Sequence, residues 1–187
     1  MAAVLASSGC SLSTGFTDAW AFPTPPRTDA VTHNHIGVRG SAYLHLPREY
    51  VWVVGAEGAV LGQTGPKDVN DQWRLAAAFG YSRLPTPFGS AVGYEVIGYA
   101  GILRGAVGDF DAPIGIYGGV HGGIPIRLDP PVAAWQRDGA LQPSILLVPE
   151  LGVGPVLGFR EEGRPRLFLE PYATLNFRIH LTSGLVP

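Results

Sequence analysis

The feature that most constrains the fold of this chain is a strict alternation of side chains in its last third. In the stretch LFLEPYATLNFRIHL, residues 167–181, every second residue from Leu167 is apolar, while the residues between them include Glu170, Asn176, Arg178 and His180. Successive side chains of a β-strand point to opposite faces, so this period of two predicts a strand with one apolar and one mixed face. The strand would be about 15 residues long, whereas strands in soluble domains average about 5–6 residues.

The same rhythm recurs along most of the chain between turns that contain Gly, Pro and Asp. It predicts seven strands between residues 36 and 181, including one over 114–128, and no stretch of ten or more residues has a convincing helical period. We therefore expect an all-β fold, an antiparallel up-and-down meander that closes into a small barrel of about eight strands. The eighth strand is expected from residues 14–22 or 132–137.

The sequence of residues 1–34 predicts two segments that do not belong to the barrel. We expect residues 1–10 to be a partial lipoprotein-signal-like segment, residues 11–34 to be an arm rich in Pro, Ser and Thr, and residues 35–187 to be the barrel domain. In MAAVLASSGC, a short apolar run and small residues precede the single cysteine, Cys10. This setting resembles the end of a bacterial lipoprotein signal, so Cys10 is the expected lipidation site.

Composition narrows the classes of partner. Only 15% of the residues are charged, against about 25% in an average soluble domain. The net charge is −2 and no basic patch is interleaved with aromatic residues, so nucleic acid is not an expected partner. No apolar run approaches the roughly 20 residues of a membrane-spanning helix. A closed barrel, however, also satisfies every backbone group in lipid, so residence in a membrane stays open.

The period of two does not by itself show which face of the strands is exposed to water. In a soluble barrel the apolar face points inward, whereas in a membrane-spanning barrel it meets lipid and polar residues fill the interior. The strand length and the single lysine, Lys67, favour the membrane-spanning barrel. The alternative is a soluble lipocalin-like barrel that binds a small apolar ligand.

The mixed faces of the predicted strands carry acids and bases in similar number. Charges inside a small barrel must pair, because an unpaired buried charge is very costly. Arginine suits this role better than lysine, since its planar fork binds a carboxylate at two points. We expect a charge network in the lumen that consists of Arg39, Glu57, Arg74, Glu95, Arg127, Glu150, Arg160, Glu170 and Arg178.

Over residues 36–181, this rhythm and face chemistry resemble those of small bacterial outer-membrane β-barrel proteins, the OmpA/OmpX-like or OmpW-like group. The resemblance carries over no functional residues. It implies the outer membrane of a Gram-negative bacterium, with outer-membrane lipid as a partner and other envelope proteins bound through loops or the N-terminal arm. A barrel of this size is too narrow for a diffusion pore. We therefore expect a non-enzymatic structural, adhesive or complex-forming role without a cofactor.

Two histidine-containing segments are candidate chemical sites. His33 and His35 have a spacing that can chelate a metal ion, but no carboxylate or cysteine is close in sequence, so we expect no metal site there. The stretch FRIHLTSG resembles the active-site region of outer-membrane lipid-A deacylases of the PagL type, with His180 and Ser183 as candidates. Their spacing departs from the His-x-Ser of that family, and Thr182 rather than Ser183 shares a face with His180. We expect His180 to pack in the interior, and a lipid hydrolase stays an alternative.

Overall fold

A computed structural model of the chain describes residues 8–24, 33–46, 52–64, 71–85, 90–107, 110–128, 142–159 and 165–183. These residues form nine antiparallel strands. Within this part of the chain, no helix is long and apolar enough to cross a membrane. The strands are β1 (Ser8–Pro23), β2 (His33–Leu46), β3 (Trp52–Thr64), β4 (Asp71–Arg83), β5 (Tyr94–Val107), β6 (Phe110–Gly123), β7 (Ile126–Arg127), β8 (Gln142–Phe159) and β9 (Arg166–Ser183).

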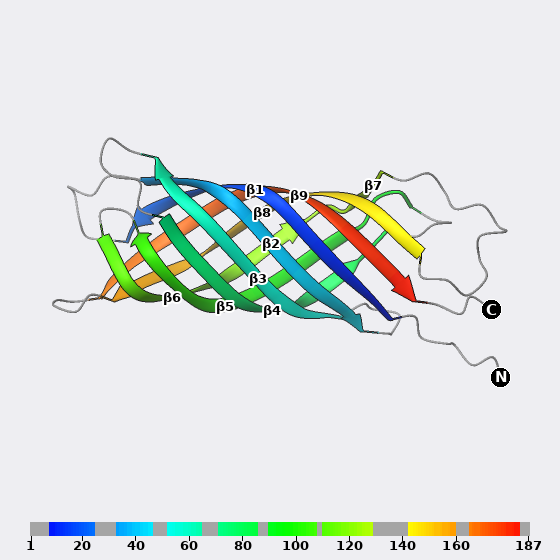
Figure 1. Cartoon of the computed structure of the whole chain (residues 1–187), viewed down its shortest axis with the longest axis horizontal. Helices are drawn as coiled ribbons and strands as arrows, with labels where there is room; N and C mark the ends of the chain where they lie inside the picture. Colours follow the sequence, from blue (N-terminus) through cyan, green and yellow to red (C-terminus); the bar gives the residue numbers. More distant parts are fainter. Residues whose placement is uncertain are drawn as a thin grey trace.

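The eight long strands close into a barrel (Figure 1). Each pairs with its neighbour along the chain, β1 pairs with β9, and β6 pairs with β8 across the short β7. Following the paired Cα positions once around the barrel from Gly9 leads to Ala19, a stagger of ten residues. Such a stagger tilts the strands against the barrel axis, as Figure 1 shows. The expected all-β meander and its closure into an eight-stranded barrel are confirmed.

The short strand β7 is the end of β6 rather than a ninth wall strand. Gly123 pairs with Glu150. Ile126 lies three residues after Gly123 and pairs with Leu147, which lies three residues before Glu150, so the register is unchanged. Pro125 and Pro149 lie in this interval, and proline has no N–H to give to the ladder. The strand predicted over 114–128 therefore exists, with one interruption at these prolines.

The expected arm of residues 11–34 is wrong over its first half. Ser8–Pro23 form β1, a full wall strand that pairs with both β2 and β9. The eighth strand therefore comes from the candidate segment 14–22, while segment 132–137 lies outside the described residues. The barrel accordingly begins at β1 and not at residue 35. The Ser and Thr content suggested an arm because Ser11, Ser13 and Thr17 fill inward positions where other strands carry larger side chains.

Two further strand prolines fall at gaps in the hydrogen-bonded ladders. The β1–β9 ladder skips two pairs between Ala19–Tyr172 and Phe22–Leu169, where Pro171 lies. The β6–β8 ladder skips two pairs between Tyr117–Val156 and Val120–Val153, opposite Pro155. Side-chain alternation continues across both gaps, so each proline removes pairing locally without changing which face a residue occupies.

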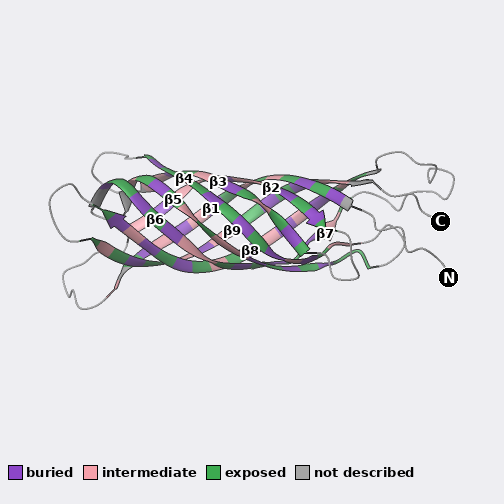
Figure 2. Cartoon of the chain, turned by 90° about the horizontal axis from the view of Figure 1, so that it is seen from below, coloured by how far each residue is buried: buried purple, intermediate pink, exposed green. Residues whose placement is uncertain are grey.

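Buried and exposed residues alternate along the strands (Figure 2), and the exposed face is apolar while the buried face mixes apolar, polar and charged residues. Every long strand exposes large apolar side chains, up to 72% exposure at Leu151, and its alternate residues are buried. This is the reverse of a soluble barrel, in which the apolar face is buried. The buried polar and charged residues are Ser11, Thr17, His35, Arg39, His45, Glu57, Gln72, Ser82, Glu95, His121, Glu150, Glu170, Thr174, Asn176 and Arg178.

Candidate functional site: the charge-paired lumen

Arg39 on β2 bonds to side chains of three other strands. Its guanidinium donates to Glu57 on β3, to Glu150 Oε2 on β8 at 3.1 Å and to the hydroxyl of Tyr172 on β9 at 3.2 Å. Glu57 also accepts a hydrogen bond from the hydroxyl of Tyr43 and lies 3.0 Å from His121 Nε2. One arginine is thus shared by two carboxylates in the middle of the barrel.

Arg178 on β9 forms the second shared contact. It binds Glu95 on β5 at two points, at 2.6 and 2.8 Å, and its Nη2 also lies 3.3 Å from Glu150 Oε1. The two-point geometry is the strong form of an arginine–carboxylate pair. Only 1% of Arg178 is exposed, so its charge depends on these carboxylates for compensation.

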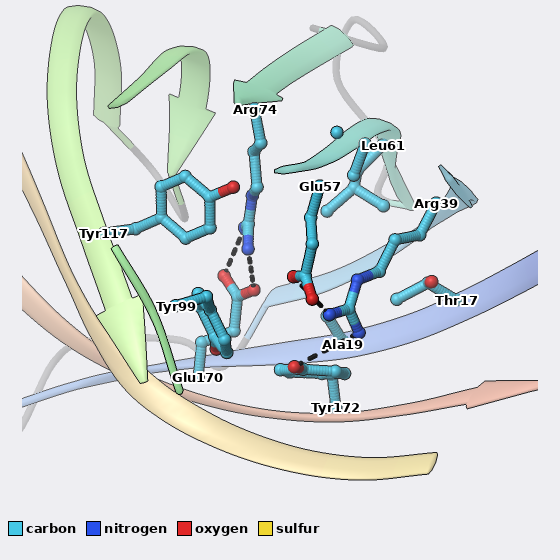
Figure 3. A pocket seen from close by; sticks show the side chains of 12 residues that line it. Thr17, Ala19, Arg39, Glu57, Leu61, Arg74, Tyr99, Tyr117, Glu170 and Tyr172 are labelled. Atoms are coloured by element: carbon cyan, nitrogen blue, oxygen red, sulfur yellow. Dashed lines mark hydrogen bonds and ion pairs between the residues drawn. The ribbon is translucent and has the colours of Figure 1, made fainter. Parts of the chain in front are cut away.

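Arg74 on β4 and Glu170 on β9 form a separate pair (Figure 3). Their contacts measure 2.5 Å between Nη1 and Oε1 and 2.7 Å between Nη2 and Oε2. The guanidinium carbon of Arg74 also lies 5.3 Å from the centre of the Tyr117 ring, a cation–π distance. Here one arginine serves one carboxylate.

A small cavity lies between this pair and Arg39 (Figure 3). Its volume is about 30 Å³, which is room for about one water molecule. Tyr99, Tyr117 and Tyr172 line it together with the charged residues. At this level, charged and aromatic side chains occupy the described lumen around the cavity.

The lumen brings together seven of the nine residues predicted for the charge network. The other two are Arg127, which is half-buried on β7, and Arg160, which lies outside the described residues. The sequence prediction missed Tyr43, Tyr172 and His121 as hydrogen-bond partners of the charged groups. Their only signal was that they share the inward parity of their strands.

Two histidines, His45 and His180, lie close together at the end of the barrel where β1 begins. Ser11 Oγ lies 2.5 Å from His45 Nε2 and 3.0 Å from His180 Nδ1, and the two rings are 4.8 Å apart. The hydroxyl that contacts His180 is therefore that of Ser11. The side chains of Thr182 and Ser183 are outside those described.

His33 and His35 lie at the start of β2, so they belong to a wall strand of the barrel and not to an arm. His33 Nδ1 is 2.6 Å from Gln63 Nε2, and His35 is fully buried. Among the described residues, neither belongs to a group of three or more potential metal ligands.

Cys10 is exposed on the outward face of β1, where it pairs with Leu44 and Leu181. Its lipidation stays a prediction.

An eight-stranded antiparallel barrel with an apolar exterior and a charged, filled lumen is the architecture of small membrane-spanning β-barrels. The expected resemblance to small outer-membrane barrels is thereby confirmed in fold. The sequence matches no family model and no curated protein. Among solved structures, the chain is similar to outer membrane protein AlkL, determined by solid-state NMR in DMPC lipid bilayers, with 8% sequence identity and a TM-score of 0.45. The alignment covers 100% of this chain and 95% of AlkL.

Proposed function

We propose that this protein is an integral outer-membrane β-barrel of a Gram-negative bacterium, with a non-enzymatic structural, adhesive or complex-forming role. The observation that carries the proposal is the inside-out distribution of side chains: large apolar residues point outward on all eight long strands, and charged residues pair inside. Lipid is the partner that this outer surface fits.

The exterior supports this proposal energetically. Apolar surface left in water costs about 25 cal/mol per Å², and soluble monomers rarely expose contiguous apolar patches above a few hundred Å². Aromatic side chains also lie near both ends of the wall, as expected for the two interfaces of a bilayer. At the end of the barrel where β1 begins, the ring of Tyr81 contacts the rings of Trp52 and Tyr94. Toward the opposite end lie Trp73 and Phe159.

The interior argues against the soluble lipocalin-like alternative. Such a barrel needs an apolar cavity for its ligand, whereas this lumen holds buried Glu and Arg side chains around a cavity of about 30 Å³. A lumen filled in this way also does not suit a diffusion pore. The proposed role therefore falls to the loops, which are the usual sites of partner binding on a rigid scaffold.

The lipid-hydrolase alternative receives no support from the described residues around His180. Its hydroxyl partner, Ser11, is only 1% exposed, so a lipid ester has no access to that oxygen. A nucleophile must be reachable by its substrate as well as bonded to a base.

We propose further that Cys10 is lipid-anchored. A lipid on this outward side chain would enter the same apolar layer as Leu44 and Leu181. Metabolic labelling with a palmitate analogue should mark the wild-type protein and not Cys10→Ser, and a wild type without label would end this part of the proposal.

Fractionation of cells that express the full-length gene tests the membrane proposal. We expect the protein in the outer-membrane fraction, extracted only by detergent, with a change in gel migration between unheated and boiled samples. A protein that purifies as a soluble monomer without detergent, and migrates identically before and after boiling, would refute it.

A further inference from the structure

The central part of the lumen has one carboxylate more than it has guanidinium groups. Among the described residues that form ion pairs there, Arg39 pairs with Glu57, Arg178 with Glu95 and Arg74 with Glu170. Glu150 has no arginine of its own: it lies 3.1 Å from Arg39 and 3.3 Å from Arg178, which both make closer contacts elsewhere. A further positive charge nearby would stabilise a carboxylate this deeply buried.

His121 places an unpartnered nitrogen beside this carboxylate. The side chain is 1% exposed, and its Nε2 contacts Glu57 at 3.0 Å. Its Nδ1 has no hydrogen-bond partner, and Glu150 Oε2 is 3.6 Å away, beyond hydrogen-bond distance. A buried polar atom in this state calls for a specific explanation, such as an ion.

Gly123 leaves room between the two carboxylates. It pairs with Glu95 on one side and Glu150 on the other, so the three residues form one row across β5, β6 and β8. A Cβ at this glycine would lie 3.0 Å from Glu95 Oε1 and 3.1 Å from Glu150 Cγ. The missing side chain therefore keeps open the space in which the two like charges face each other.

We propose that Glu95, His121 and Glu150 form a binding site for a borderline divalent cation, with Zn²⁺ as its representative. One donor atom from each residue lies within 4.8 Å of the others. Two ligands about 2.1 Å from a tetrahedral zinc ion are about 3.4–3.6 Å apart, and the distance between His121 Nδ1 and Glu150 Oε2 is 3.6 Å.

The donor set also fits this class of ion. One imidazole nitrogen with two carboxylate oxygens suits Zn²⁺, Mn²⁺ or Fe²⁺ better than the softer ions that prefer sulfur. Glu95 keeps its two bonds to Arg178, because each carboxylate oxygen can accept more than one contact. The site does not depend on the proposed location of the barrel.

Zinc titration of the full-length protein, refolded in detergent and stripped with a chelator, tests this site. Calorimetry should show one Zn²⁺ per chain, and Co²⁺ should give the visible absorption of a four-coordinate ion. His121→Gln and Gly123→Ala should each weaken Zn²⁺ binding at least tenfold, the second by filling the space while keeping all three donors. His180→Gln, a matched change at another lumen histidine, should leave the affinity unchanged.

Absence of Zn²⁺ binding in the wild type would overturn the proposal. Binding that persists unchanged in His121→Gln, or that disappears in His180→Gln, would place the ion elsewhere and overturn it as well. Should His121→Gln fail to fold, Gly123→Ala decides between the same outcomes.

Discussion

The lumen contains two ion-pair regions that compensate buried charges in different ways. The Arg74–Glu170 pair is self-contained, with one guanidinium and one carboxylate in two-point contact. In the central cluster, which we define as Arg39, Glu57, Glu95, His121, Glu150 and Arg178, each arginine contacts two carboxylates. A self-contained pair can be removed as a unit, whereas removing one arginine of the shared cluster leaves two carboxylates with less compensation. Three substitutions, in decreasing order of expected effect, test this difference.

Arg178→Met should destabilise the barrel most. It strips Glu95 of its two-point partner and Glu150 of one of its two arginines. Breaking a buried ion pair costs about 3–5 kcal/mol, and we expect a loss of about 5 kcal/mol in the free energy of unfolding. Urea unfolding in lipid vesicles, followed by tryptophan fluorescence, measures it. Adding Glu95→Met should restore only part of the loss, since Glu150 stays undercompensated.

Arg74→Met should destabilise by about 3 kcal/mol, because it leaves Glu170 without its arginine and removes one hydrogen-bond donor from the buried Gln72. The double variant Arg74→Met/Glu170→Met should recover nearly the whole loss, since a buried ion pair can be replaced by apolar groups at little net cost. The same unfolding assay compares this double variant with Arg178→Met/Glu95→Met. Equal recovery in both double variants would remove the distinction between a separate pair and a shared cluster.

Glu150→Gln should have the smallest effect, a change of about 1 kcal/mol or less in the metal-free barrel, since it removes the carboxylate without its own arginine. The matched variant Glu95→Gln leaves Arg178 without its principal partner and should cost more. A larger loss of unfolding free energy in Glu150→Gln than in Glu95→Gln would show that Glu150 is not the carboxylate in excess.

The wall of the barrel could be predicted from the sequence over most of its length, because alternation reports the face of each residue directly. The strand β1 was predicted only in part, as one of two candidate segments, since small Ser and Thr occupy its inward positions and Asp18 interrupts the apolar outward face. Pro125, Pro149 and Pro171 weakened the pattern but did not shift its parity.

Partners across the lumen could not be predicted in the same way. Parity places Arg178 and Glu95 inside, but their contact spans 83 residues of sequence. It depends on the stagger of ten residues, which is set by the sum of all strand registers. For the same reason, the sequence does not distinguish Glu150, shared between two arginines, from Glu170, which has its own.

The central claim is that the apolar face of this barrel meets lipid. Spin labels attached to single cysteines along β4, in a Cys10→Ser background reconstituted into lipid vesicles, test it most directly through their accessibility to quenchers. Labels at the outward positions Leu75, Ala77 and Phe79 should be accessible to oxygen, which concentrates in the bilayer, and shielded from a water-soluble nickel complex. Labels at the inward positions Ala76 and Ala78 should be shielded from both. Outward labels that the nickel complex reaches freely would contradict a lipid-facing wall.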